Sequence, residues 1–147
     1  MSYVKQASGP KELEQCFHIR REVFMKEQNV AEELEMDGLD HDCIHFLAFE
    51  NSSALLEHAI GTARLWIDEQ GRAKAQRVAI LRSYRGHGYG RHLMRALEAH
   101  AASLGHEEIW LGAQIQAMQF YEGQGYRAKG DMFLDANIPH KMMVKSL

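Results

Sequence analysis

An alternating run of glycines is the segment of this sequence with the clearest chemistry. It follows a strand-like apolar segment and precedes a helical pattern, so it lies in a strand-to-helix turn. Glycine adopts positive φ and lets a ligand approach the backbone closely. Free N–H groups at such a turn, supported by the helix dipole, bind anions, and flanking arginines pair with phosphate oxygens. The turn consists of Arg85, Gly86, His87, Gly88, Tyr89, Gly90 and Arg91.

The turn lacks the features of two common phosphate-binding loops. The chain has no Gly-Lys-Ser/Thr segment of the kind that binds a nucleoside triphosphate. The third glycine of the dinucleotide fingerprint is also missing, because Arg91 occupies the position after Gly90. A glycine-rich turn without any ligand remains the alternative interpretation.

The turn resembles motif A of the GNAT superfamily of N-acetyltransferases. The family pattern is Gln/Arg-x-x-Gly-x-Gly/Ala, and this chain has Arg85, Gly88 and Gly90 at the matching positions. The resemblance implies that the loop amides bind the pyrophosphate of acetyl-CoA. It also implies that the preceding strand contacts the pantetheine arm and supplies an N–H group to the developing oxyanion. That strand contains Val78, Ala79 and Ile80.

A second segment resembles motif B of the same family, Ala-x-x-Phe-Tyr-x-x-x-Gly-Phe/Tyr. It contains Ala117, Phe120 and Tyr121, with Gln114 shortly before them. The resemblance implies that these four residues also contact the cofactor. Residues 21–30, 35–40 and 138–143 are further similar to the YjcF/ElaA-like predicted acyltransferases, so the likeness covers nearly the whole chain.

The implied reaction moves an acetyl group from acetyl-CoA to a primary amine of a small molecule, by direct attack in a ternary complex. The resemblance implies that Tyr121 protonates the departing thiolate. A positioned acid of this kind contributes roughly 10²–10⁴-fold to the rate. The alternative for Tyr121 is a core position with a satisfied hydroxyl. A non-catalytic module of the same fold that only senses acyl-CoA is the alternative function.

Several side chains are candidates for activating the amine, which is about one-thousandth deprotonated at neutral pH. His140 is the preferred base, because an unperturbed imidazole titrates near neutrality. A chain of water molecules is an alternative to any single base. Four further residues are candidates for binding the acceptor or for acting as the base: Glu27, Glu35, Asp37 and His45.

The acidic run over residues 32–42 leaves the charge of the acceptor open. It is interpreted either as a negative surface that attracts a cationic amine or as a solvated loop. Arg20 and Arg21 would instead favour a phosphorylated or carboxylated acceptor. His41-x-Cys43-x-His45 has the spacing of metal ligands, but no fourth ligand follows at a recognisable distance, so no metal is expected.

Hydrophobic periodicity predicts the elements that carry these residues. Helices are expected over residues 10–26 and 116–123, and between them a helix with Leu93, Leu97, Ala101 and Leu104 that ends at Gly105. A loop or broken helix is expected over residues 28–42. Strands are expected over 44–49, 59–67, 74–81, 108–112, 126–134 and 141–145, with Asn51-Ser52-Ser53 in the first connection.

These elements predict a mixed α/β fold with a mostly antiparallel sheet, a parallel strand pair in its middle and flanking helices. The first three strands form an antiparallel meander, and a right-handed crossover leads to the parallel pair. The strand over residues 141–145 is expected at a sheet edge, where it would pair across a homodimer.

Composition limits the class of protein. A chain of 147 residues with 46% hydrophobic and 25% charged residues is typical of one domain, here residues 1–147. The net charge of −3 argues against nucleic acid as a partner. Two cysteines are too few for a disulfide framework, and no apolar run is long enough to span a membrane, so we expect a cytoplasmic protein without a membrane partner.

Overall fold

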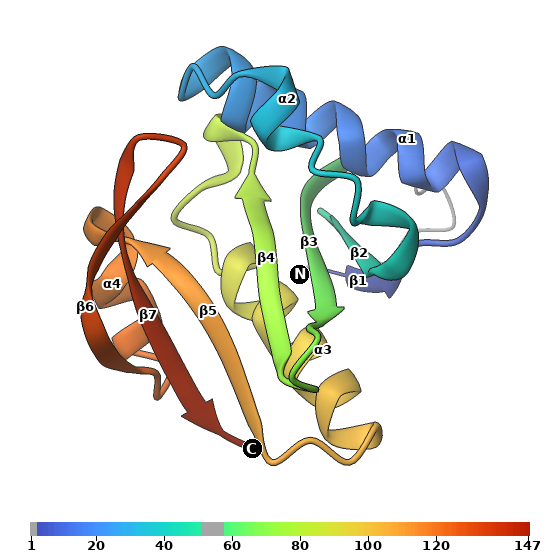
Figure 1. Ribbon diagram of the computed structural model, residues 1–147. Coiled ribbons are helices and arrows are strands. Elements are labelled where there is room, and N and C mark those ends of the chain that lie inside the picture. The colour runs from blue at the N-terminus through green and yellow to red at the C-terminus, as the bar shows by residue number, and fades with distance from the viewer. Residues whose placement is uncertain (1–2, 51–57) are drawn as a thin grey trace.

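The computed structural model describes residues 3–50 and 58–147, and within these ranges seven strands form one sheet. The predicted connection at Asn51-Ser52-Ser53 lies outside the described residues. The strand order is β1-β2-β3-β4-β5-β7-β6 (Figure 1). The strands are β1 (Tyr3–Gln6), β2 (Ile44–Phe49), β3 (Ala59–Ile67), β4 (Ala73–Ile80), β5 (Glu108–Gln114), β6 (Arg127–Asp135) and β7 (Ile138–Ser146).

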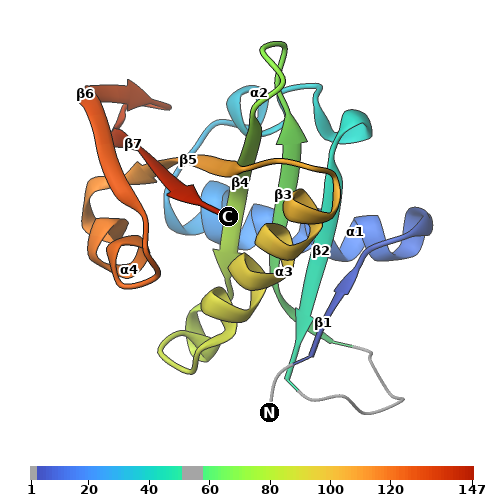
Figure 2. The ribbon, with the colours of Figure 1, turned by 90° about the horizontal axis from the view of Figure 1, so that it is seen from below.

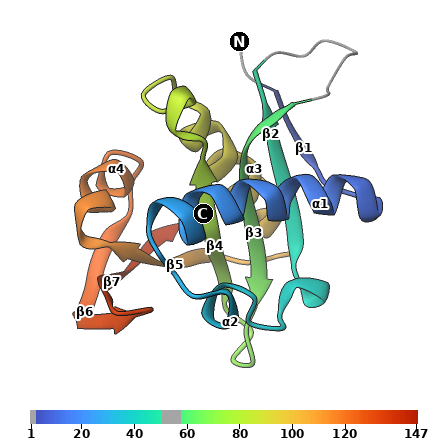
Figure 3. The same ribbon diagram turned by 90° about the horizontal axis from the view of Figure 1, so that it is seen from above.

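Helices cover both faces of the sheet (Figures 2 and 3). The long helix α3 packs on one face, and α1 crosses the strands on the other face. The α-helices are α1 (Gly9–Arg20), α2 (Glu32–Glu35), α3 (Tyr89–Ser103) and α4 (Met118–Glu122). A π-helix, η1 (Arg21–Glu27), continues α1, and short 3₁₀ turns occur at η2 (Asp40–Asp42), η3 (Arg82–Tyr84) and η4 (Ile115–Ala117).

The amphipathic pattern of α3 builds the larger core. Leu93, Leu97 and Ala101 are fully buried against the sheet, as the four-residue spacing predicted. Leu104 was expected on the same apolar face, but its side chain is 52% exposed because the helix has already ended at Ser103. Gly105 follows with a φ of 91°, the left-handed conformation that terminates helices.

The parallel pair predicted in the middle of the sheet is β4 and β5, and it is short. Its register runs from Ala73 opposite Ile109 to Ala75 opposite Leu111. Beyond these residues the two strands diverge, as Figure 1 shows. The divergence coincides with a register shift between β3 and β4 and with a positive φ of 55° at Arg77. The sheet is therefore split at its centre, and the split positions the candidate site.

The predicted edge strand is wrong. The segment over residues 141–145 belongs to β7, which pairs with β5 on one side and with β6 on the other. The exposed edge is β6, and the sequence analysis also missed β1, which is only four residues long. A homodimer stays a prediction, but β7 has no free edge with which to form it.

No helix among the described residues is both long enough and apolar enough to cross a membrane.

Candidate active site

A cavity of about 650 Å³ occupies the split between β4 and β5. Its walls come from the end of β4, the turn before α3, the end of β5, α4, η1 and the β6–β7 turn. Most of the residues singled out from the sequence therefore meet at one place. Those that line the cavity are Glu35, Val78, Ala79, Ile80, Arg85, Gly86, Gly88, Tyr89, Gly90, Arg91, Gln114, Ala117, Phe120, Tyr121 and His140.

The glycine turn forms one end of this cavity. Gly86 and Gly88 have φ values of 82° and 89°, which residues with a side chain rarely adopt. Gly88 is the N-cap of α3 and offers no side-chain acceptor, so the first N–H groups of the helix are available to a ligand. A side chain at Gly90 would meet the ring of Phe120 at 2.9 Å, so this turn also needs glycine for packing. His87, also part of the turn, is outside the cavity wall.

Arg85 is engaged by another part of the protein. Its Nη1 and Nη2 donate to the two carboxylate oxygens of Glu27 at 2.6 and 2.7 Å, and its Nε donates to the carbonyl of Ile80 at 2.9 Å. The hydrogen bonds from Arg85 lower the pKa of Glu27. Glu27 was a candidate for acceptor binding, but its carboxylate ties the end of η1 to the turn. Arg91 is the arginine of the turn that lies at the start of α3.

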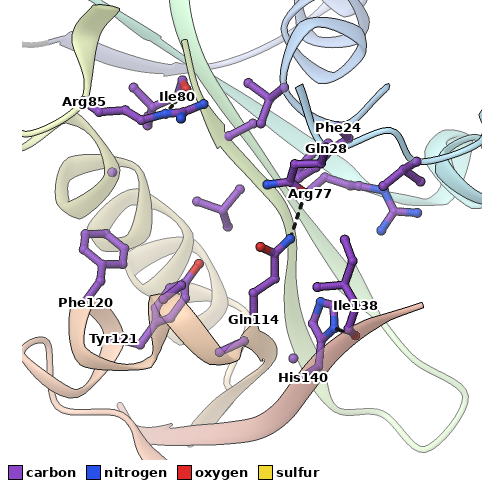
Figure 4. A pocket seen from close by; sticks show the side chains of 18 of the residues that line it. Phe24, Gln28, Arg77, Ile80, Arg85, Gln114, Phe120, Tyr121, Ile138 and His140 are labelled. Atoms are coloured by element: carbon purple, nitrogen blue, oxygen red, sulfur yellow. Dashed lines mark hydrogen bonds between the residues drawn. The ribbon is translucent and has the colours of Figure 1, made fainter. Parts of the chain in front are cut away.

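Tyr121 lies on α4 with its hydroxyl directed into the cavity (Figure 4). Its ring packs edge-on against Phe120 and Tyr126, with centroids 4.9 and 5.8 Å away. Burial raises the pKa of Tyr121 above its ordinary value, because the phenolate would lose solvation. The phenol is therefore held in the form that can donate a proton.

His140 faces the same cavity from β7. Its Nδ1 is 2.6 Å from the carbonyl oxygen of Ile138, and its ring stacks on Phe133. We assign the Nδ1 proton to this hydrogen bond, because a carbonyl can only accept. The assignment leaves the lone pair on Nε2 available to accept a proton. The partner strands also place His140 opposite Gln114 on β5.

The sequence analysis missed the side chains that close the other end of the cavity. Gln114 donates from its amide to Oε1 of Gln28 at 2.9 Å, which links β5 to the residue after η1 (Figure 4). Phe24, Arg77 and Ile138 line the same region. Gln28 follows Glu27 directly in the helix-like segment, but no local pattern indicates which strand it meets.

The acidic run is neither solvated nor free to attract a cation. Arg20 binds Glu35 through two nitrogens at 2.6 and 2.8 Å, and Arg64 binds Asp37 through two nitrogens at 3.1 and 2.6 Å. Asp40 accepts from both arginines. The side chains of Arg20, Arg64 and Glu35 are 1%, 1% and 2% exposed. These carboxylates are structural partners of arginines, so neither open interpretation of the acceptor charge follows from them.

His45 and Asp37 are outside the cavity wall. The Nε2 atom of His45 is 2.8 Å from the carbonyl oxygen of Asp40, and burial lowers the pKa of His45 because it disfavours the imidazolium. Cys43 is hydrogen-bonded to the carbonyl of Leu39, and His41 is exposed. Across residues 3–50 and 58–147, no group of three His, Cys, Asp or Glu side chains is arranged to hold a metal ion.

The buried carboxylates give a first prediction, on acid stability. Burial opposes ionisation of Asp37, but hydrogen bonds from Arg64 and from the backbone of Leu39 hold its pKa at about 2. Because this value is below the unfolded value near 3.9, Asp37 stabilises the fold above about pH 4 and loses this effect as the pH falls toward 2. We expect Asp37→Asn to remove on the order of 1 kcal/mol at pH 6 and to flatten this decline.

Urea unfolding at pH 6, 4 and 2.5 measures this effect. The matched control is Asp131→Asn, which changes an exposed carboxylate on β6. Equal slopes with pH for the parent and Asp37→Asn would show that Asp37 does not contribute as described.

A mixed sheet that splits after a short parallel pair, with a glycine turn and helix start at the split, is the architecture of an N-acetyltransferase. The model of the acetyltransferase (GNAT) family matches residues 12–126. The chain belongs to this family, which confirms the resemblance and the fold expected from the sequence.

Individual relatives agree with this assignment. The chain is 39% identical to the uncharacterized N-acetyltransferase YjcF of Bacillus subtilis over 140 residues, which cover 95% of this chain and 96% of YjcF. A solved structure from Lactobacillus plantarum has a TM-score of 0.89 and 26% identity, and covers 99% of this chain and 98% of that chain. ElaA of Escherichia coli has a TM-score of 0.83 and 23% identity, with 99% of both chains covered, and supports the fold.

Proposed function

We propose that residues 1–147 form one domain that transfers an acetyl group from acetyl-CoA to a primary amine of a small molecule. One observation carries this proposal: a single cavity joins an anion-binding helix start at one end to Tyr121 and His140 further along. The residues fit the cofactor, because glycines with positive φ leave the start of α3 open to a pyrophosphate. When bound, acetyl-CoA supplies the thioester carbonyl that the amine attacks.

Each remaining step is assigned to a group of this chain. The N–H groups of residues 89–91 hold the pyrophosphate, with Arg91 beside them. The backbone of residues 78–80 holds the pantetheine arm and donates to the charge that develops on the carbonyl oxygen. Nε2 of His140 takes a proton from the amine, directly or through water. As the carbon–sulfur bond breaks, Tyr121 donates its proton to the sulfur.

Calorimetric titration with acetyl-CoA, followed by turnover of a panel of amines, tests this proposal. Micromolar binding with turnover of an amine supports it. Absence of binding by the folded protein contradicts the cofactor assignment. Binding without turnover of any amine would identify a sensing module instead. The two cysteines described as free thiols, Cys16 and Cys43, support a cytoplasmic location for this activity.

The role of His140 has its own test. We expect His140→Gln to lower kcat/KM about tenfold near neutral pH, because glutamine cannot accept the amine proton. The loss should shrink at higher pH, where more of the amine is already neutral. His18→Gln, on the exposed side of α1, is the control. A pH–rate profile of His140→Gln that coincides with the parent would exclude this histidine as the base.

A further inference from the structure

The conformation of Arg77 is unusual for its place in the fold. The residue lies within β4, yet its φ is 55°, in the left-handed region. A residue that carries a Cβ disfavours this region roughly tenfold relative to glycine. The extended conformation of a strand would be the default for an arginine, so something outside the strand must hold the backbone.

The Arg77 side chain supplies that restraint. Its Nη2 donates to the carbonyls of Leu34 and Glu35 at 3.3 and 3.1 Å and to Oδ2 of Asp37 at 3.2 Å. Its Nε is 3.4 Å from Oε2 of Glu35. In Figure 4 the side chain runs away from Tyr121 and Gln114, toward the segment that bears these acceptors.

The acceptors of Arg77 are themselves fixed. Glu35 is clamped by Arg20, and Asp37 is clamped by Arg64, which is rooted in β3 beside β4. Arg20 and Arg64 are almost completely buried, so the segment over residues 34–37 cannot follow Arg77 without exposing or separating buried ion pairs. Arg77 is therefore tied to a rigid part of the molecule.

The conformation at residue 77 determines the shape of the cavity. On β3, Arg64 pairs with Gln76 while Thr62 pairs with Ala79, so β4 has one extra residue between these pairs. Pairing with β5 extends only to Ala75. The backbone after this bulge, residues 78–80, is turned into the cavity wall.

We propose that Arg77 is a positioning residue: its guanidinium holds the bulge of β4 in the left-handed conformation and so aims the backbone of residues 78–80 at the reacting carbonyl. This inference rests on the proposed acetyl transfer. Arg77 acts through the backbone and does not touch the reacting atoms, so it should affect the rate of transfer more than the binding of the cofactor, which is held mainly at α3.

Substitutions that separate the side chain from the backbone preference test this role. Arg77→Ala removes the anchor but keeps the Cβ, and we expect kcat to fall about tenfold while the Kd for CoA stays within about twofold. Arg77→Gly also removes the anchor, but glycine adopts positive φ freely, so we expect it to recover at least about threefold of the lost kcat. Arg72→Ala, which removes an arginine bound to Asp68 outside this cluster, should resemble the parent.

The order of the two variants decides between explanations. A merely structural anchor predicts that glycine is no better than alanine, because glycine adds backbone freedom. A direct contact with the acceptor predicts that both variants lose activity equally and raise the KM for the amine. Either result would overturn the proposal.

A second readout is independent of turnover. A strong intraresidue HN–Hα nuclear Overhauser effect marks a positive φ, and we expect it at residue 77 in the parent and in Arg77→Gly but not in Arg77→Ala. If Arg77→Ala fails to fold, Arg77→Lys takes its place, because one ammonium cannot span the same acceptors. Retention of this signal and of full kcat in Arg77→Lys would contradict the role. If the parent turns over no amine, the proposed function fails, while this signal still reports on the bulge.

Discussion

Replacement of Gly88 by glutamate should weaken the binding of acetyl-CoA by about 100-fold or more. The new carboxylate would stand at the N-cap of α3, where we place the pyrophosphate. Two unit charges about 4 Å apart near a protein surface repel by about 4 kcal/mol, and about 2.7 kcal/mol is enough for a 100-fold loss. The carboxylate would also accept hydrogen bonds from the N–H groups that the cofactor needs. Calorimetric titration with acetyl-CoA measures the loss directly.

The chain offers a closely matched control for this variant. Gly105 has a φ of 91°, nearly the same as the 89° of Gly88, and both positions have open space where a side chain would begin. Gly105 follows the opposite end of α3, away from the cavity wall. Gly105→Glu therefore imposes a similar backbone strain and the same charge, and it should bind acetyl-CoA like the parent. Equal affinities for Gly88→Glu and the parent would remove the helix start of α3 as the cofactor site.

Tyr121→Phe should lower kcat about 100-fold and leave the Kd for CoA within about twofold, since a positioned acid contributes at least this much. The substitution removes one oxygen that faces the cavity, and within the part of the chain that the structure describes no hydrogen bond to this hydroxyl is lost. The fold should therefore be unaffected. Steady-state kinetics with a saturating amine, together with CoA titration, separates the acid role from a packing role.

Tyr126→Phe is the control, because its hydroxyl is also buried but donates to Glu98 at 2.7 Å, outside the cavity wall. It should keep the kcat of the parent with some loss of stability. The pH dependence supplies a further check. Because burial raises the pKa of Tyr121, its proton-donating form persists to higher pH than for an exposed tyrosine, so kcat should not decline up to about pH 10 through loss of this proton. Full kcat in Tyr121→Phe would show that another group protonates the sulfur.

The sequence predicted those parts of the site whose residues are contiguous. The turn over residues 85–91 and the Phe120-Tyr121 pair were recognised because residue type and spacing within a short segment fix their local geometry. The helices and most strands were recognised for the same reason, since a repeat of 3.6 or 2 residues is set by the backbone itself. His140 was chosen on chemistry alone, and the structure places it in the same cavity.

Contacts between distant segments were decided by the tertiary structure. Glu27 and Arg85 are 58 residues apart, and Gln28 and Gln114 are 86 apart, so no local pattern indicates either pair. The same holds for the acidic run, whose carboxylates looked available until the fold brought arginines from α1, β3 and β4 against them. A carboxylate in water and one clamped by a guanidinium have the same sequence signature, because the difference is in burial and pairing.

Sequence alone thus determined the family, the element types and the residues of the glycine turn. The order of the last strands, the split between β4 and β5 and the left-handed backbone at Arg77 required the three-dimensional arrangement. Local patterns report the backbone preferences of a few neighbouring residues. A strand's partners and a strained φ depend on side chains that meet only after the chain has folded, and here those side chains are the arginines and carboxylates beneath the cavity.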